Sequence, residues 1–189
     1  MSDNIDINKK TSSGLGICIL FSIVFTLLVA ADQIIKKIIV DNIKFSGPVA
    51  VIDNFFYLHY AENTGSAFSL FADKAWGIYF LSGVSTILGI GIFALMIIAA
   101  KHELKLLSFA FCLLSSGAFG NLIDRYRLKY VVDFMRFDFG SYTFPIFNFA
   151  DMCAVVGTIL IICIIIFGSK YFETFWNLFF AKKENNNAG

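Results

Sequence analysis

The chain has 189 residues, of which 58% are hydrophobic and only 15% are charged. Its mean hydropathy of +0.74 lies well above the usual balance in soluble globular domains. Fifteen Lys and Arg against fourteen Asp and Glu leave a formal net charge of +1, which offers no basic field for nucleic acid. The composition therefore excludes nucleic-acid binding and predicts a single integral membrane domain over residues 1–189.

Four charge-free runs predict the transmembrane helices. They cover residues 11–31, 75–100, 106–123 and 152–169, and each meets or approaches the roughly 20 residues that a helix needs to cross a hydrocarbon core. With flanking residues adjusted, the predicted spans are 15–35, 75–100, 106–125 and 149–170. A cleaved signal peptide is the alternative for the first run, but the run is longer than a usual signal-peptide core and three more spans follow it.

Four spans place both termini on one side of the membrane and the segments 36–74 and 126–148 on the other. Four acids then fall at the same membrane face, namely Asp32, Asp124, Asp133 and Asp151. The positive-inside rule does not decide which face this is, because seven Lys and Arg lie on the terminal side and eight on the side of the large segments.

The segments outside the spans carry two further patterns. Residues 55–60 are rich in strand-forming aromatics after a Gly47-Pro48 turn, which predicts a small β-sheet on the membrane surface. Aromatic residues recur at helical spacing from Phe172 to Phe180, typical of an interfacial amphipathic helix or of a frayed extension of the fourth span. The predicted fold class is a membrane all-α protein, a four-transmembrane-helix bundle with a small extramembrane β-sheet and a loop or helix on the same side as the sheet.

Carboxylates are the main candidates for chemistry. The chain has two histidines, His59 and His102, and neither a metalloprotease H-E-x-x-H motif nor a convincing serine-hydrolase motif. No Cys or His cluster has metal-ligand spacing, so we expect no metal and no cofactor. Ionisable residues at a membrane boundary are costly and mark function. Two carboxyl groups that share one proton can activate water for attack on an amide.

The residues alone leave open which acids form such a pair. Asp124 is followed by Arg125, which favours a structural ion pair, whereas Asp133 has only apolar neighbours. Asp151 could instead cap the fourth span, where a carboxylate suits the positive helix end. The same acids could also form the proton relay of a small proton-coupled transporter. However, they cluster at one face, and the opposite half of each span lacks charge.

Five motifs, in order, resemble the type II signal peptidases, the bacterial lipoprotein signal peptidases. They are Asp32-Gln33-x-x-Lys36, Asn63-x-Gly65-x-Ala67-Phe68, Gly117-Ala118-x-Gly120-Asn121-x-x-Asp124-Arg125, Val131-Val132-Asp133-Phe134 and Phe147-Asn148-x-Ala150-Asp151. The resemblance runs over about residues 15–168 and keeps the family's order, spacing and four spans. Two positions depart from it, since Ile35 replaces a small hydroxyl residue and Ser116 a glycine, and neither touches a carboxylate.

The resemblance implies an intramembrane aspartic endopeptidase with Asp133 and Asp151 as the catalytic dyad. This family removes signal peptides from prolipoproteins on the N-terminal side of a diacylglyceryl-modified cysteine. It acts at the extracytoplasmic face of the bacterial cytoplasmic membrane and is sensitive to globomycin, so both termini would be cytoplasmic. We expect a monomer surrounded by membrane lipids. The residues implied to bind substrate or support the dyad are Asp32, Lys36, Asn63, Gly65, Asn121, Asp124, Arg125, Asn148 and Ala150.

Overall fold

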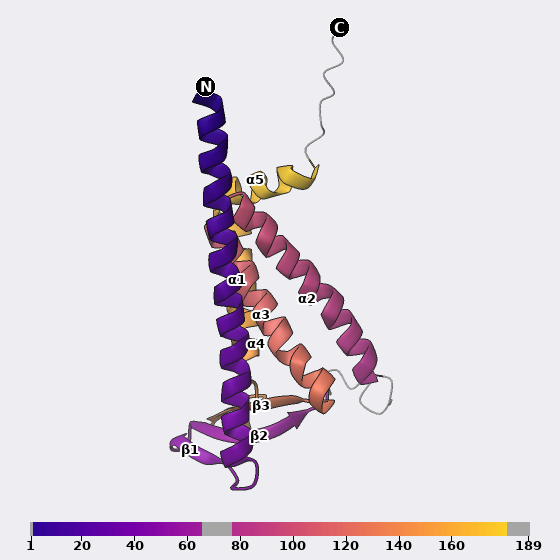
Figure 1. Ribbon diagram of the computed structural model, residues 1–189. Coiled ribbons are helices and arrows are strands. Elements are labelled where there is room, and N and C mark those ends of the chain that lie inside the picture. Colours follow the sequence, from indigo (N-terminus) through magenta and orange to yellow (C-terminus); the bar gives the residue numbers. More distant parts are fainter. Residues whose placement is uncertain (1, 66–76, 181–189) are drawn as a thin grey trace.

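The computed structural model describes residues 2–65 and 77–180 (Figure 1). Within these residues the helices are α1 (Ser2–Ile43), α2 (Gly77–Lys101), α3 (Lys105–Leu128), α4 (Phe149–Phe167) and α5 (Ser169–Phe180). The strands are β1 (Val49–Ile52), β2 (Phe56–Asn63), β3 (Val131–Phe139) and β4 (Tyr142–Thr143). Figure 1 shows the sheet at one end of the long helices and α5 near the other.

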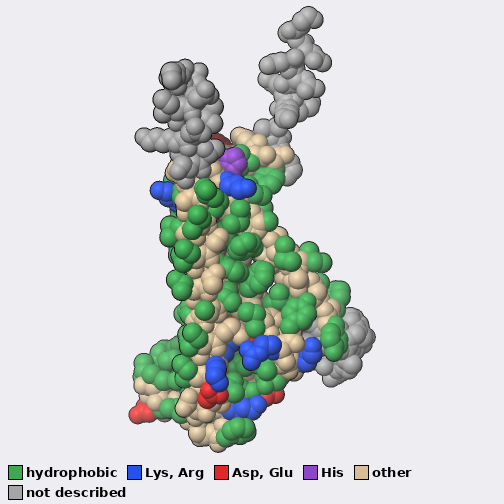
Figure 2. Space-filling view, in the orientation of Figure 1, with side chains coloured by type: hydrophobic (Ala, Val, Ile, Leu, Met, Phe, Trp, Pro, Cys, Tyr) green, Lys and Arg blue, Asp and Glu red, His purple; other side chains and the backbone are tan. Residues whose placement is uncertain are grey.

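Four of the described helices are long and apolar enough to cross a membrane. These candidate spans are Ser13–Ile43, Ser82–Lys101, Lys105–Leu128 and Phe149–Phe167, which confirms the predicted four-span layout. Exposed Leu, Ile and Val side chains cover much of α1, α2 and α4. On the face in Figure 2 they form an apolar shaft, with charged side chains gathered at its two ends. An apolar exposed surface of this extent suits lipid rather than water.

Helix α3 is the central helix of the bundle. It packs against α1, α2 and α4. Of its apolar span 61% is buried, compared with 22% for each of the other three candidate spans. Glycines permit the close approach of α4. A methyl group added at Gly157 would meet the Ala110 carbonyl oxygen at 2.8 Å, and one added at Gly117 would collide with the Ala150 carbonyl oxygen. Small residues thus set the spacing of these two helices.

Helix α1 is longer than predicted at its C-terminal end. The first span was expected to end at residue 35, with an extramembrane segment from residue 36, but α1 continues to Ile43. The reason is that Ile39 and Ile43 repeat at helical spacing and pack against Val132 and Phe134 of β3 in a second buried cluster. The helix therefore carries its last two turns over the sheet.

The strands form one antiparallel sheet in the order β1-β2-β3-β4. Strands β1 and β2 confirm the sheet predicted in the first extramembrane segment. The second extramembrane segment, residues 126–148, adds β3 and β4 to this sheet. Residues 131–133 and 135–137 of β3 pair with β2, with Asp133 opposite Ala61. A bulge between Leu58 and Ala61 in β2 adjusts the register on this strand pair.

Helix α5 begins directly after Gly168 and is separate from α4. In Figure 1 it turns away from the axis of α4 and lies across the end of the bundle. Phe175 packs on Phe111 of α3 with ring centroids 5.7 Å apart, so the aromatic side of α5 faces the bundle. This agrees with the predicted amphipathic helix rather than with an extension of the fourth span.

Candidate active site

Asp133 and Asp151 come from two elements that meet at the sheet end of the bundle. Asp133 is the third residue of β3 and is 3% exposed. Asp151 lies in the first turn of α4, three residues after the N-cap residue Asn148. Each of these last two side chains accepts a hydrogen bond from the other's backbone N–H, which forms a capping box. The capping role considered for Asp151 is confirmed, and it holds the carboxylate at the positive end of the helix.

Every oxygen of the two carboxyl groups accepts a hydrogen bond from an amide. Asn63 Nδ2 donates to Asp133 Oδ2 at 2.8 Å, and Asn148 Nδ2 donates to Asp133 Oδ1 at 2.7 Å. Asn121 Nδ2 donates to Asp151 Oδ1 at 2.8 Å, and the Asn148 backbone N–H donates to Asp151 Oδ2 at 3.0 Å. Asn148 therefore contacts both acids and links them in a fixed arrangement.

A fixed donor orients each of these asparagines. Lys36 Nζ can only donate, and it contacts Asn121 Oδ1 at 3.0 Å, so the Asn121 NH₂ group faces the dyad. The Gly65 backbone N–H donates to Asn63 Oδ1 at 2.8 Å and orients that amide in the same way. Gly65 has a φ of 88°, a conformation that favours glycine. The capping box orients the third amide, that of Asn148.

Burial changes the proton affinity of the Asp133 carboxyl group. It raises the pKa of this carboxyl from 3.8 to about 6, because desolvation disfavours the charged form. The hydrogen bonds from Asn63 and Asn148 act in the opposite direction, and the negative charge of Asp151 raises the pKa again. The environment therefore favours retention of a proton on Asp133.

A buried ionic cluster lies directly behind the dyad. Lys36 Nζ is 2.9 Å from Asp32 Oδ2 and 2.9 Å from Asp124 Oδ2, and the three side chains are at most 3% exposed. With Asn121 as the third acceptor, all three donors of the ammonium group are used. A buried charge of this kind is tolerated because it is paired and fully hydrogen-bonded.

The predicted pairing of Asp124 with Arg125 is wrong. Asp124 faces α1 and pairs with Lys36, and its Oδ2 also accepts from the Val132 backbone N–H at 3.1 Å. Adjacent residues on a helix point in different directions, so the Arg125 side chain does not face the same partners as Asp124. Its larger electrostatic interactions are with Asp151 and Asp133, and that with Asp124 is smaller. Its buried Nε has no hydrogen-bond partner among the described residues.

The cluster also ties α1 to α3 and α4. The Ala150 backbone N–H donates to Asp32 Oδ1 at 3.0 Å, so this acid helps to satisfy the start of α4. A methyl group added at Gly120 of α3 would meet Asp32 Oδ2 at 2.7 Å. Only glycine permits this approach without a shift. All eleven predicted site residues thus lie in or beside one network, and Ala67 and Phe68 of the second motif lie outside the described residues.

Gln33 is a contributor to which the sequence analysis assigned no role. Its Nε2 is 3.1 Å from Asp32 Oδ2, from the Gly120 carbonyl oxygen and from Asp124 Oδ1, so it bridges α1 and α3. The only signal in the sequence was its position next to Asp32 in the first motif. The network as a whole presents two hydrogen-bonded carboxyl groups and one nearby guanidinium. In the described part of the chain, no group of three or more His, Cys, Asp or Glu residues is arranged to hold a metal ion.

This arrangement has the elements required for general acid–base chemistry. One carboxyl group with a raised pKa can hold a proton, while the other lies at a helix N-terminus that favours negative charge. The charge of Asp151 contributes to the raised pKa of Asp133, so the two groups interact electrostatically. A water between them would meet a base on one side and an acid on the other.

Comparison with known proteins gives a consistent result. The family model for signal peptidase (SPase) II matches residues 24–167. A lipoprotein signal peptidase of Latilactobacillus sakei is 34% identical over 152 residues, which cover 80% of this chain and 97% of that protein. The lipoprotein signal peptidase of Bacillus subtilis is 35% identical over 142 residues, covering 75% of this chain and 90% of that protein.

The fold has solved counterparts as well. A bacterial membrane enzyme structure obtained by the in meso method at 1.9 Å resolution superposes with a TM-score of 0.67 at 33% identity. The superposition covers 79% of this chain and 92% of the solved one. A second such structure, at 2.3 Å resolution, matches with the same TM-score and identity.

Proposed function

The chain belongs to the signal peptidase II family, and on this premise we propose that it removes the signal peptide from diacylglyceryl-modified prolipoproteins. The family resemblance expected from the five motifs is confirmed by the match over residues 24–167. Members of this family are peptidases, and this chain is a multi-pass membrane protein. The proposed cleavage lies on the N-terminal side of the lipidated cysteine.

The proposed catalytic residues are Asp133 and Asp151, and the observation that carries this is the pair of carboxyl groups bridged by Asn148. Asp151 takes a proton from the attacking water as the water oxygen bonds to the scissile carbonyl carbon. Asp133, whose pKa is raised to about 6, donates its proton to the carbonyl oxygen. These two transfers give a neutral tetrahedral diol.

Collapse of the diol completes the reaction with the same two groups. Asp151 returns its proton to the leaving amide nitrogen as the C–N bond breaks. Asp133 takes the proton from the hydroxyl group as the carbonyl re-forms, and the dyad is restored to one proton and one charge. No metal or cofactor is required for either half of this sequence.

Arg125 is the proposed contact for the substrate backbone. Its buried Nε has no partner among the described residues, and the guanidinium interacts electrostatically with both acids of the dyad. A buried donor without a partner is costly unless a ligand completes it. A carbonyl oxygen of the extended signal peptide would supply the missing acceptor.

The proposed location is the extracytoplasmic face of the bacterial cytoplasmic membrane. The acids lie where the apolar helices end and the sheet begins, a depth at which a cysteine anchored by two acyl chains can reach them. The proposed working unit is a monomer over residues 1–189. The transporter alternative would require polar groups along the spans, whereas α4 carries no charged residue after Asp151 in its first turn, and α2 carries none before its last residue, Lys101.

Cleavage of a diacylated prolipoprotein by the purified protein tests this function. The expected product is the free signal peptide and a lipoprotein that begins at the lipidated cysteine, identified by mass spectrometry. A precursor without the diacylglyceryl group serves as the matched control and should remain intact. Release from both precursors, or from neither, would be evidence against the proposal.

Chelation and inhibition test the mechanism separately. Activity should survive exhaustive dialysis against EDTA, because the dyad uses only carboxyl groups. Globomycin, a cyclic peptide that resembles the substrate, should block cleavage. If EDTA abolishes activity and zinc restores it, the metal-free dyad mechanism is wrong even if prolipoprotein remains the substrate.

A further inference from the structure

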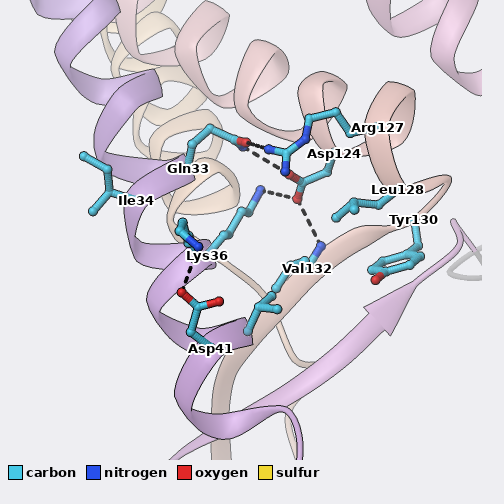
Figure 3. Close-up of a pocket in the computed structure, with 11 residues that line it drawn as sticks. Gln33, Ile34, Lys36, Asp41, Asp124, Arg127, Leu128, Tyr130 and Val132 are labelled. Atoms are coloured by element: carbon cyan, nitrogen blue, oxygen red, sulfur yellow. Dashed lines mark hydrogen bonds and ion pairs between the residues drawn. The ribbon is translucent and has the colours of Figure 1, made fainter.

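A cavity lies beside the buried Lys36 cluster, between α1, α3 and β3 (Figure 3). It encloses about 350 Å³ and is separate from the two acids of the dyad, neither of which lines it. Its walls combine apolar side chains, including Ile34, Val40 and Leu128, with the cations Lys37 and Arg127. We propose that this cavity binds the phosphate-bearing head group of an anionic phospholipid.

The position of the cavity relative to lipid supports this occupant. Ile34 and Ile38 of α1 are exposed, and they continue the apolar surface that Ile23 and Leu27 begin nearer the bundle centre. Ile38 is the last exposed large apolar residue of α1, and Lys37 lies beside it in the sequence. Lipid covering this surface would end in its phosphate groups at the level of the cavity.

Arg127 supplies a positive charge that no ion pair neutralises among the described residues. Among the described residues, its guanidinium makes one hydrogen bond, a long one of 3.5 Å from Nη1 to Gln33 Oε1, and it forms no ion pair. In Figure 3 the side chain reaches from α3 toward Gln33 on α1. A guanidinium has five N–H donors arranged in a fork that matches a phosphate group, so most of its donors remain available.

Lys37 adds a second cation that a phosphate could recruit. It pairs with Asp41 at 2.9 Å, but the two side chains are 75% and 52% exposed. Such exposed pairs are weak, so exchange of Asp41 for a phosphate oxygen is inexpensive. Lys36, in contrast, is fully engaged with two buried acids and contributes no free charge. The lining cations outside the buried cluster are therefore Lys37 and Arg127.

The apolar walls distinguish a lipid from a free anion. Ile34, Val40 and Leu128 line the cavity beside the charged groups, and they suit the glycerol and first acyl carbons of a lipid. A free phosphate would use only the cations. The chemical class expected is therefore a phosphodiester lipid with a net negative charge, from the leaflet on the side of the sheet.

Native mass spectrometry of the full chain tests this, with micelles that contain equal amounts of phosphatidylglycerol and phosphatidylcholine. The wild type should retain phosphatidylglycerol in preference. Arg127→Gln should lower the retained fraction about fivefold, the change typical of one basic residue near an anionic lipid. Asp41→Asn should raise retention, because it frees Lys37. Lys129→Gln is the matched control, since Lys129 contacts Tyr126 and Tyr79 instead.

Four results would overturn the proposal, three with the variants and lipids and one with a competitor. Arg127→Gln could retain lipid as the wild type does, Lys129→Gln could lose as much as Arg127→Gln, or the two lipids could be retained equally. Inorganic phosphate is the competitor that separates a lipid site from a simple anion site, and displacement of phosphatidylglycerol by phosphate alone would favour the latter. The experiment contains no peptide substrate, so its outcome is independent of the proposed peptidase activity.

Discussion

At the scale of single residues, the proposed site consists of side chains that share hydrogen-bond and ion-pair partners. Asp133 and Asp151 each have both oxygens hydrogen-bonded to amides, and one asparagine contacts both. The neighbouring Lys36 likewise serves two acids at once. Losing one acid therefore leaves the other without its partner in the proposed proton transfers, and losing Lys36 leaves two buried carboxylates without a counter-charge.

Asp133→Asn and Asp151→Asn should each lower the rate of prolipoprotein cleavage by at least about a thousandfold while the protein still folds. The double variant should be no slower, because either change already removes the mechanism. Asp133→Glu should also lose about a hundredfold, since one extra methylene displaces the carboxyl group. The measurement is initial rate at matched protein levels.

Asp53→Asn is the matched control for these variants. Asp53 is an exposed acid in the turn between β1 and β2, and its loss should leave the rate unchanged. Asp124→Asn should lower stability through its contact with Lys36 but retain measurable turnover. A dead Asp124→Asn together with a near wild-type Asp133→Asn would reassign the dyad.

The pH dependence should follow Asp133. This carboxyl must be protonated to donate, and burial raises its pKa to about 6, so the protonated form is present below that pH and is lost above it. We expect kcat/KM to fall as pH rises through about 6, by about tenfold per pH unit beyond it. A kcat/KM profile that is flat or rises across this range would contradict the assignment of Asp133 as the acid.

Lys36→Met should destabilise the protein by about 3–5 kcal/mol, because it leaves Asp32 and Asp124 buried without a counter-charge. Lys37→Met is the matched control. Its side chain is 75% exposed, and its loss should change stability by no more than about 1 kcal/mol. Thermal unfolding in detergent without added lipid measures both. Equal effects of the two substitutions would mean that the cluster is not a stabilising unit.

At the scale of helices and strands, the spacing of α3 and α4 positions the dyad. Gly117 faces Ala150, which directly precedes Asp151, so the backbone of α4 rests against α3 at the level of the site. The capping box then begins α4 at this point. A change in the spacing of these helices would move one carboxyl group relative to the other.

Gly117→Ala should therefore destabilise the protein by about 1–3 kcal/mol and slow cleavage, because its methyl group collides with Ala150 and Ala154. Gly91→Ala is the opposite case. Gly91 lies inside α2 with nothing within 4 Å of an added methyl group, so alanine there should be neutral or stabilise by up to about 1 kcal/mol. Thermal unfolding and cleavage rates of both variants give the comparison. A stabilising Gly117→Ala would disprove the close packing.

At the scale of the whole molecule, the charges lie at the ends of the apolar shaft (Figure 2). The four spans require both termini to be on one side and the sheet on the other. The counts of basic residues do not assign the sides, so the cytoplasmic location of the termini rests on the family. This leaves the orientation as a prediction.

A reporter fused after Lys183 should be active only in the cytoplasm, and one inserted at Gly47 only outside it. The physical reason is that four membrane crossings return the chain to its starting side. Paired fusions with a cytoplasm-active and an exported reporter at each position supply the control. Exported-reporter activity after Lys183 would invert the topology and remove the proposed access of lipoproteins to the site.

Much of this architecture could be predicted from the sequence alone. The four spans follow from apolar length, because a chain in lipid must satisfy its backbone hydrogen bonds internally and does so as helices. The proposed site residues come from the five motifs, through their resemblance to the family. The i, i+4 positions of Asp32 and Lys36 also place them on one face of a helix.

The tertiary structure alone decided which groups meet. Asp124 adjoins Arg125 in the sequence but pairs with Lys36 from another helix, because neighbouring helical residues diverge. The strand at Asp133 and the last turns of α1 depend on each other's packing, so neither was evident from local pattern. Asn148 joins the two acids only because β3 and the start of α4 converge. The hydropathy of a segment predicts whether it spans the membrane. Which side chains pair with each other depends on the directions in which they point, and only the folded backbone determines those directions.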